Sequence, residues 1–176
     1  MPLDVHSLRA QFPIFQQSED GGVPIVYFDS AATAQVPVSV LDAERVFQET
    51  SRANVHRGMH ILAEQATVAY EEARKKVRSF LNAQKSVEII FTKSCTESIN
   101  LVAKSWGRKN LKNGDVIVLS ILEHHSNIVP WLQLKEEIGI ELKWIDLDDA
   151  GQLNLEQYDQ YLAKGDVQLV AITGQS

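Results

Sequence analysis

The segment Phe91-Thr92-Lys93-Ser94-Cys95-Thr96-Glu97-Ser98-Ile99-Asn100 runs from an apolar, strand-like stretch through a turn of hydroxyl-bearing residues into a helix. The first N–H groups of a helix have no partner inside it, and the helix dipole adds partial positive charge, so this turn can hold a phosphate dianion. Ser94 and Thr96 would add hydroxyl donors. Ordinary capping by Ser94, with Glu97 in the first turn, accounts for the same residues without a ligand, so this segment alone leaves both interpretations open.

The alternation of strand and helix continues beyond this segment. Apolar runs predict strands near 87–91, 116–119, 142–145 and 167–172, separated by helices near 96–107, 128–138 and 154–163. Strands that alternate with crossover helices form a mostly parallel sheet with helices on both faces, so the fold class is α/β. Ligands of such sheets bind beyond the carboxyl ends of the strands, where we expect the site.

The residues before this pattern predict a short extended segment at 23–28 and a helix that starts near Pro37 and runs to about Arg52. A further helix carries an apolar stripe that we expect to face the core; its members, at spacings of four and three, are Ala66, Tyr70, Ala73, Val77 and Phe80. We assign residues 1–36 to an N-terminal segment and residues 37–176 to the first part of a large domain.

Composition narrows the classes of protein. With 176 residues, 44% of them hydrophobic and 23% charged, the chain can form a real core. The net charge of -6 argues against nucleic acid and anionic membranes as partners. A single cysteine rules out an internal disulfide, and no basic leader or membrane-spanning run is evident. We therefore expect the protein in the cytoplasm, or in an organelle stroma after processing.

Polar residues follow the predicted strands where ligands would bind. They are Ser94-Cys95-Thr96 after the first strand, Glu123-His124-His125-Ser126-Asn127 after the second and Thr173-Gly174-Gln175-Ser176 after the fourth. An imidazole offers a flat face that can stack on an aromatic ring and a nitrogen that moves protons near neutral pH. A phosphate seat beside such a ring suggests pyridoxal phosphate.

The chain resembles the N-terminal part of the class V aminotransferase family and, within it, the group of SufS-type cysteine desulfurases and selenocysteine lyases. The resemblance spans nearly the whole chain and is carried by Tyr27-Phe28-Asp29-Ser30-Ala31-Ala32-Thr33-Ala34-Gln35, Asn54-Val55-His56-Arg57-Gly58-Met59-His60, Cys95-Thr96-Glu97-Ser98-Ile99-Asn100-Leu101-Val102-Ala103 and Glu123-His124-His125-Ser126-Asn127-Ile128-Val129-Pro130-Trp131. It implies the large domain of the pyridoxal-phosphate-dependent transferase fold type I.

The resemblance also implies a cofactor site for pyridoxal 5'-phosphate. Thr96 and the adjoining backbone at Cys95, with Ser94 beside them, would contact the phosphate. His124 would stack on the pyridine ring and is the candidate catalytic residue for proton movement.

The substrate residues implied by the resemblance lie earlier in the chain. Ala31 and Ala32 would line the substrate pocket, and His56 and Arg57 would lie in a loop close to the active-site mouth and the dimer interface. An exposed, solvated charge is the simpler explanation of Arg57.

Two further readings of single residues are weaker. His56 and His60 are four residues apart, but no third ligand has suitable spacing and Gly58 disfavours a continuous helix, so we expect no metal. Cys95 is not the persulfide-forming nucleophile, because the resemblance places that residue far toward the C-terminus. A small structural residue is the better interpretation of Cys95, although a helix N-terminus can lower a thiol pKa.

The reaction implied by the resemblance takes sulfur from L-cysteine or L-selenocysteine, gives L-alanine and an enzyme persulfide, and passes the sulfur to a SufE- or SufU-type acceptor for iron–sulfur cluster assembly. The resemblance also implies homodimers of proteins more than twice as long as this chain, with the Schiff-base lysine and the catalytic cysteine at positions beyond Ser176. We therefore expect a truncated, inactive fragment. Another class V enzyme, such as a transaminase or a kynureninase-like hydrolase, and a non-catalytic assembly module remain alternatives.

Overall fold

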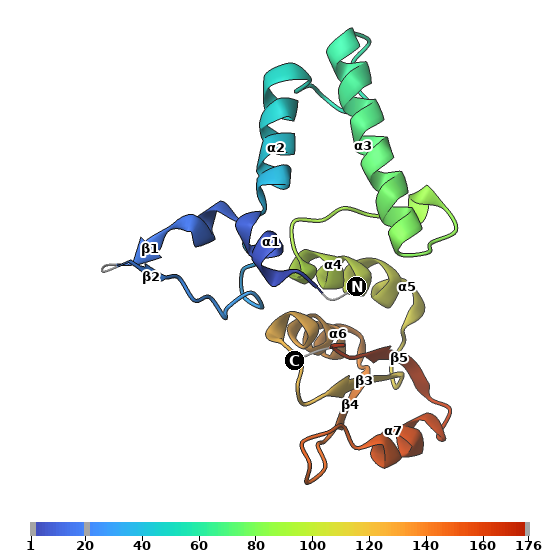
Figure 1. Cartoon of the computed structure of the whole chain (residues 1–176). Coiled ribbons are helices and arrows are strands. Elements are labelled where there is room, and N and C mark those ends of the chain that lie inside the picture. Colours follow the sequence, from blue (N-terminus) through green and yellow to red (C-terminus); the bar gives the residue numbers. More distant parts are fainter. Residues whose placement is uncertain (1–2, 20–21, 175–176) are drawn as a thin grey trace. The chain divides into compact units, whose positions relative to one another are not determined.

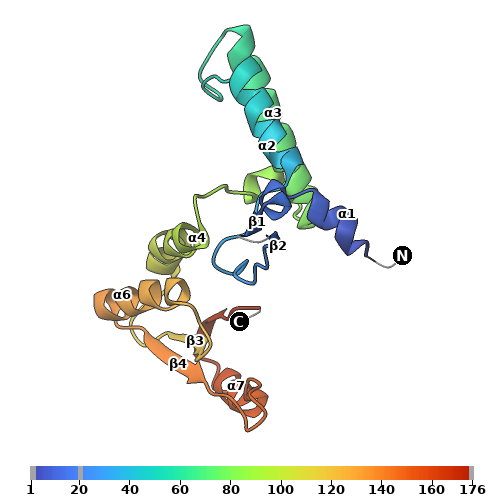
Figure 2. The same cartoon turned by 60° about the vertical axis from the view of Figure 1, so that its left-hand side comes forward.

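The computed structural model describes residues 3–19 and 22–174 (Figure 1 and Figure 2). The chain divides into two compact units, Met1–Ile89 and Ile90–Ser176. Among the described residues, none of the helices is long and apolar enough to cross a membrane. The assignment of 1–36 and 37–176 to an N-terminal segment and a large domain stays a prediction.

The second unit contains a three-stranded parallel sheet. Strand β3 (Val116–Ser120) lies in the centre, with β4 (Glu141–Ile145) on one side and β5 (Val167–Ala171) on the other. The predicted strands at 116–119, 142–145 and 167–172 are therefore confirmed. Although β3 and β5 are distant in sequence, they are neighbours in the sheet, so the residues that follow them meet at one edge.

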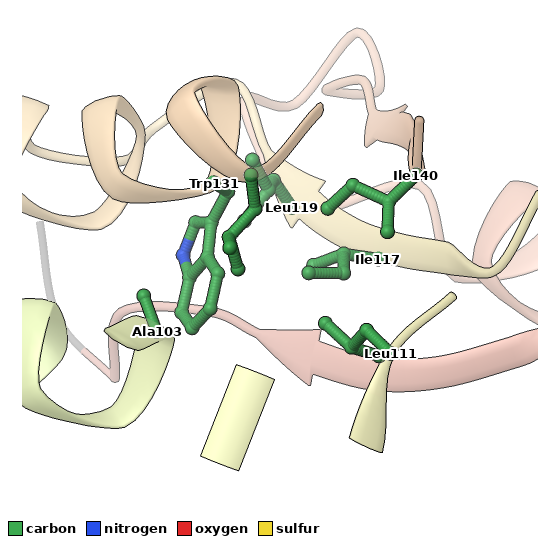
Figure 3. Close-up of a cluster of buried hydrophobic side chains, with 7 residues drawn as sticks. Ala103, Leu111, Ile117, Leu119, Trp131 and Ile140 are labelled. Atoms are coloured by element: carbon green, nitrogen blue, oxygen red, sulfur yellow. The ribbon is translucent and has the colours of Figure 1, made fainter. Parts of the chain in front are cut away.

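Helices cover both faces of this sheet, which confirms the predicted α/β class. Ile117 and Leu119 point into a cluster with Trp131 of α6 (Val129–Ile138), as Figure 3 shows. On the opposite face, a smaller cluster forms around the alternate residues of β3; its members are Val116, Val118 and Ile145, with Tyr158 and Tyr161 of α7 (Leu155–Leu162) packed against it. Every residue of β3 is buried, as expected for a central strand with two covered faces.

A long helical segment precedes β3. Helix α4 (Cys95–Val102) continues through a π-helical turn, η3 (Ala103–Gly107), into α5 (Arg108–Asn110). Gly107 allows the π-helical turn to approach α6 closely, because an added Cβ would lie 2.8 Å from Cδ1 of Leu134. The predicted helices at 96–107, 128–138 and 154–163 are confirmed.

The predicted strand at 87–91 is wrong. The segment forms a 3₁₀ turn, η2 (Ser86–Glu88), and then an extended stretch that pairs with no strand in the described part of the chain. Arg74 donates a hydrogen bond to the carbonyl of Ile89, and Ile90 and Phe91 are exposed. An apolar run indicates burial or extension, but only a neighbouring strand can supply the ladder that makes it a strand.

The first unit is mainly helical. In chain order it contains α1 (Val5–Ala10), the 3₁₀ turn η1 (Pro13–Gln16), the antiparallel pair β1 (Ser18–Glu19) and β2 (Val23–Pro24), α2 (Val38–Thr50) and α3 (Ile61–Phe80). The helix expected from Pro37 is α2. Of the extended segment expected at 23–28, only Val23 and Pro24 form a strand, β2.

Helix α3 carries the stripe that we expected to face the core, and the structure corrects that expectation. Ala66 is buried and Val77 is half-buried, but Ala73 is exposed and 89% of the Phe80 surface is accessible. Burial requires a second apolar surface, and within its own unit α3 buries only Ala63 and Ala66.

Candidate functional site

A cleft of about 450 Å³ opens in the second unit at the carboxyl ends of β3 and β5, where the sequence places the site. Its lining comes from α4, from the segment after β3, from α6 and from the end of β5; the residues are Cys95, Ser98, Ile99, Val102, Glu123, His124, Ser126, Asn127, Trp131, Leu169, Val170, Ala171, Ile172 and Thr173. One wall thus carries the start of a helix and another carries an imidazole.

The start of α4 is a capped helix N-terminus. The Ser94 hydroxyl accepts a hydrogen bond from the Glu97 amide at 3.2 Å, and the Glu97 carboxylate accepts one from the Lys93 amide at 2.6 Å. The capping interpretation of Ser94 and Glu97 is therefore confirmed. In the described part of the chain, no acceptor is found for the amides of Cys95 and Thr96, which leaves two donors for an anion.

His124 also lines the cleft, at the start of the 3₁₀ turn η4 (His125–Asn127). Its Nδ1 accepts a hydrogen bond from the Ser126 amide at 3.1 Å and lies 2.9 Å from the Ser126 hydroxyl oxygen. Because a backbone amide can only donate, the neutral ring carries its proton on Nε2. Among the described residues, the cleft is lined by His124 and not by His125, although their rings contact edge to face.

Glu123 is a buried residue of the cleft that the sequence reading did not select. Only 8% of its surface is accessible, and its carboxylate accepts hydrogen bonds from Ser120, Asn127 and the Thr173 amide. A glutamate is almost never buried without partners. A glutamate directly after an apolar strand was therefore the sequence signal that could have indicated a buried, hydrogen-bonded carboxylate at the site.

The predicted phosphate residues are only partly brought to the cleft. Cys95 lines it together with His124, whereas Ser94 and Thr96 flank Cys95 and are not among its lining residues. The predicted Gln175 and Ser176 lie outside the described residues.

The predicted substrate residues lie in the first unit. Ala31 and Ala32 form an exposed turn, which is closed by a hydrogen bond from the Ala32 amide to the Asp29 carbonyl. Arg57 is exposed and lines a shallow hollow together with Arg52 and other residues of that loop.

His56 adopts a left-handed backbone with φ of 62°, which is uncommon outside glycine. Its amide donates to the Thr67 hydroxyl at 2.9 Å, and its Nε2 lies 3.0 Å from Oε1 of Glu71. Helix α3 therefore holds the loop in this conformation. A Cβ on Gly58 would overlap the Ala63 side chain, so the loop also needs a glycine there.

His60 is used for capping. Its Nδ1 accepts a hydrogen bond from the Ala63 amide at 3.4 Å at the start of α3. Within residues 3–19 and 22–174, no group of three or more His, Cys, Asp or Glu side chains has an arrangement that could hold a metal ion.

A family model described as Aminotransferase class-V matches residues 26–176. The chain belongs to the class V aminotransferase family. A cysteine desulfurase from Synechococcus elongatus is 49% identical over 160 residues, which are 91% of this chain and 25% of that protein. A cysteine desulfurase from Salmonella newport is 49% identical over 156 residues, which are 89% of this chain and 38% of that protein.

Solved structures of class V relatives show the same fold. The apo cysteine desulfurase of Thermococcus onnurineus NA1 has a TM-score of 0.85 at 38% identity, over 98% of this chain and 40% of that one. The cysteine desulfurase CsdA of Escherichia coli has a TM-score of 0.78 at 35% identity, over 97% of this chain and 41% of that one. The resemblance to class V cysteine desulfurases is confirmed, and the chain spans less than half the length of these relatives.

Proposed function

We propose that this chain supplies the cofactor-binding cleft of a pyridoxal-phosphate-dependent cysteine desulfurase of the SufS type. The observation that carries the proposal is the cleft itself, in which the first turn of α4 at Cys95 and the imidazole of His124 line one cavity. The similar curated proteins are named cysteine desulfurases, which favours this reaction over that of a transaminase or a kynureninase-like hydrolase.

The residues of the cleft fit pyridoxal phosphate in both chemistry and size. The amide of Cys95, which lines the cleft, and the amide and hydroxyl of the adjoining Thr96 are donors suited to a phosphate dianion at a helix N-terminus. Ile99 and Val102 add apolar wall, and the volume of about 450 Å³ lies in the range of small-molecule pockets. When bound, the cofactor acts as an electron sink for the substrate.

The chain's own residues would bind and orient the ring and help to move a proton. His124 presents its ring to the cleft while Ser126 holds Nδ1, so Nε2 is left as the nitrogen that can donate or accept a proton. We propose that the intact enzyme converts L-cysteine to L-alanine with the sulfur held as an enzyme persulfide. The chain 1–176 is expected to release no sulfide from L-cysteine, and sulfide release by the purified chain would contradict this.

The binding site is tested with a pair of ligands that differ only in the phosphate. Pyridoxamine 5'-phosphate has no aldehyde and so does not react with surface lysines, and Trp131 in the cleft is a fluorescent reporter. We expect saturable quenching by pyridoxamine 5'-phosphate and at least about tenfold weaker binding of pyridoxamine, because a phosphate seat requires the dianion. Trp131→Phe should remove the signal. Equal affinity for the two ligands, or no binding, would refute the site.

The wider biology is also a proposal, supported by the family resemblance. The assembled enzyme would be a homodimer, would accept L-cysteine or L-selenocysteine, would pass sulfur to a SufE- or SufU-type protein for iron–sulfur cluster assembly, and would work in the cytoplasm or an organelle stroma. Sedimentation equilibrium that finds only monomers of the active enzyme would rule out the first of these.

A further inference from the structure

We propose that Glu123 is a positioning residue that holds the His124 turn and the end of β5 together and so sets the direction of the His124 ring. This positioning role rests on the proposed function in one respect, namely that the His124 ring faces a cofactor.

The carboxylate of Glu123 joins three parts of the unit. Its Oε1 accepts from the Ser120 hydroxyl at 2.6 Å, at the end of β3, and its Oε2 accepts from Nδ2 of Asn127 at 2.7 Å, in η4. The Thr173 amide, just after β5, reaches both oxygens at 2.9 and 3.0 Å. A buried carboxylate with this many donors fixes the relative positions of the elements that provide them.

Two of the three partner groups can only donate to Glu123, since one is the backbone amide of Thr173 and the other is Nδ2 of Asn127. The Ser120 oxygen already accepts from the Leu122 amide at 3.3 Å, so its proton is available to the carboxylate. Oδ1 of Asn127 accepts from Nε1 of Trp131 at 3.0 Å, which forces Nδ2 toward Glu123 and the Ala171 carbonyl. Because the Thr173 amide reaches both oxygens, the side-chain amide of a glutamine at position 123 would set one donor against another.

The network reaches His124 through the η4 turn. The Asn127 amide donates to the His124 carbonyl at 2.8 Å, and the Ser126 amide donates to Nδ1 of the ring. Since Glu123 anchors the Asn127 side chain, it fixes the turn from which the ring projects. Thr173, the third partner, also lines the cleft.

The test compares Glu123→Gln with Glu136→Gln, an identical change at an exposed glutamate of α6. The ring nitrogens of His124 and the exchange rate of the Thr173 amide are followed by NMR in the whole chain. For Glu123→Gln we expect the Nδ1 acceptor signature of His124 to be lost and Thr173 exchange to rise by about tenfold or more. His60, whose Nδ1 also accepts a backbone amide, is the internal reference and should not change.

Unchanged His124 and Thr173 signals in a folded Glu123→Gln protein would overturn the proposal, and so would equal changes in Glu136→Gln. Should Glu123→Gln fail to fold, Ser120→Ala removes one donor only. It should shift the same signals in the same direction by less, and no shift there would also overturn the proposal.

Ligand titration separates this inference from the proposed function. We expect Glu123→Gln to weaken pyridoxamine 5'-phosphate binding by about threefold, because the His124 ring loses its direction and with it part of its stacking contact. If the unsubstituted chain binds no pyridoxamine 5'-phosphate, the proposed function fails, while the NMR comparison still decides whether Glu123 positions His124. If binding is normal and the NMR signals do not respond to Glu123→Gln, only the positioning role fails.

Discussion

Two histidines that are adjacent in sequence have different surroundings at the residue scale. His124 lines the cleft and His125 does not, although both belong to the same polar run after β3. The difference arises because the η4 turn directs one ring to the cavity and ties its Nδ1 to Ser126. The pair therefore provides a variant and its matched control from one turn.

His124→Ala should weaken binding of pyridoxamine 5'-phosphate by about fivefold, which corresponds to about 1 kcal/mol for a lost ring-stacking contact. His125→Ala should bind the ligand as the unsubstituted chain does. Fluorescence titration of Trp131 measures both affinities. Equal losses for the two variants would show that the turn, and not the His124 ring, is what the ligand requires.

At the scale of elements, the close packing of η3 on α6 depends on Gly107. A glycine-to-alanine change inside a helix ordinarily stabilises it by about 1 kcal/mol. Here the new Cβ would lie 2.8 Å from Cδ1 of Leu134, which is 2% exposed and has little room to move. Overpacking of a core costs about 1–3 kcal/mol, so the contact should outweigh the propensity.

We therefore expect Gly107→Ala to lower the free energy of unfolding by about 1 kcal/mol in urea denaturation. Gly174→Ala is the control, because an added Cβ there meets nothing within 4 Å. An unchanged or raised stability for Gly107→Ala would mean that α6 shifts freely away from the π-helical turn.

The ion pair between α5 and α6 gives a pH dependence. Arg108 donates two hydrogen bonds to Glu137, at 2.9 and 2.7 Å, and these lower the pKa of Glu137 below its ordinary value of 4.5. A lowered pKa in the folded state adds stability that is present above pH 4.5 and is lost as the pH falls through the folded-state pKa.

Glu137→Gln should therefore reduce the unfolding midpoint slightly at neutral pH, and the difference from the unsubstituted chain should vanish in acid. The pair is exposed, so the effect should also shrink in high salt. Thermal unfolding at several pH values measures it. A difference that grows on acidification would contradict the assigned direction of the Glu137 pKa.

At the scale of the whole molecule, buried apolar side chains concentrate in the second unit. Both hydrophobic clusters flank β3, whereas α2 buries no residue and α3 buries only two alanines. Local stability follows buried contacts, so protection from exchange should differ strongly along the chain.

Hydrogen exchange followed by mass spectrometry should show the amides of β3 as the slowest, and those of α2 and most of α3 as among the fastest helical amides. Comparable protection of α3 and β3 in the purified chain would contradict this. In that event a second apolar surface, such as another copy of the chain, must cover α3.

Sequence pattern alone was sufficient for much of this protein. The runs at 116–119, 142–145 and 167–172 predicted the three strands, and the polar residues after them predicted which edge of the sheet carries the cleft. Such local signals succeed because side-chain periodicity and helix caps depend on residues that are close along the chain.

Tertiary structure decided what depends on distant partners. The stretch at 87–91 is apolar but pairs with no strand, and Phe80 belongs to an apolar stripe but is exposed. Glu123 gains the Thr173 amide as a partner because the pairing of β3 with β5 brings the two residues together. Burial and hydrogen bonding are properties of pairs of surfaces, and a sequence specifies one member of each pair without showing which residues will meet it.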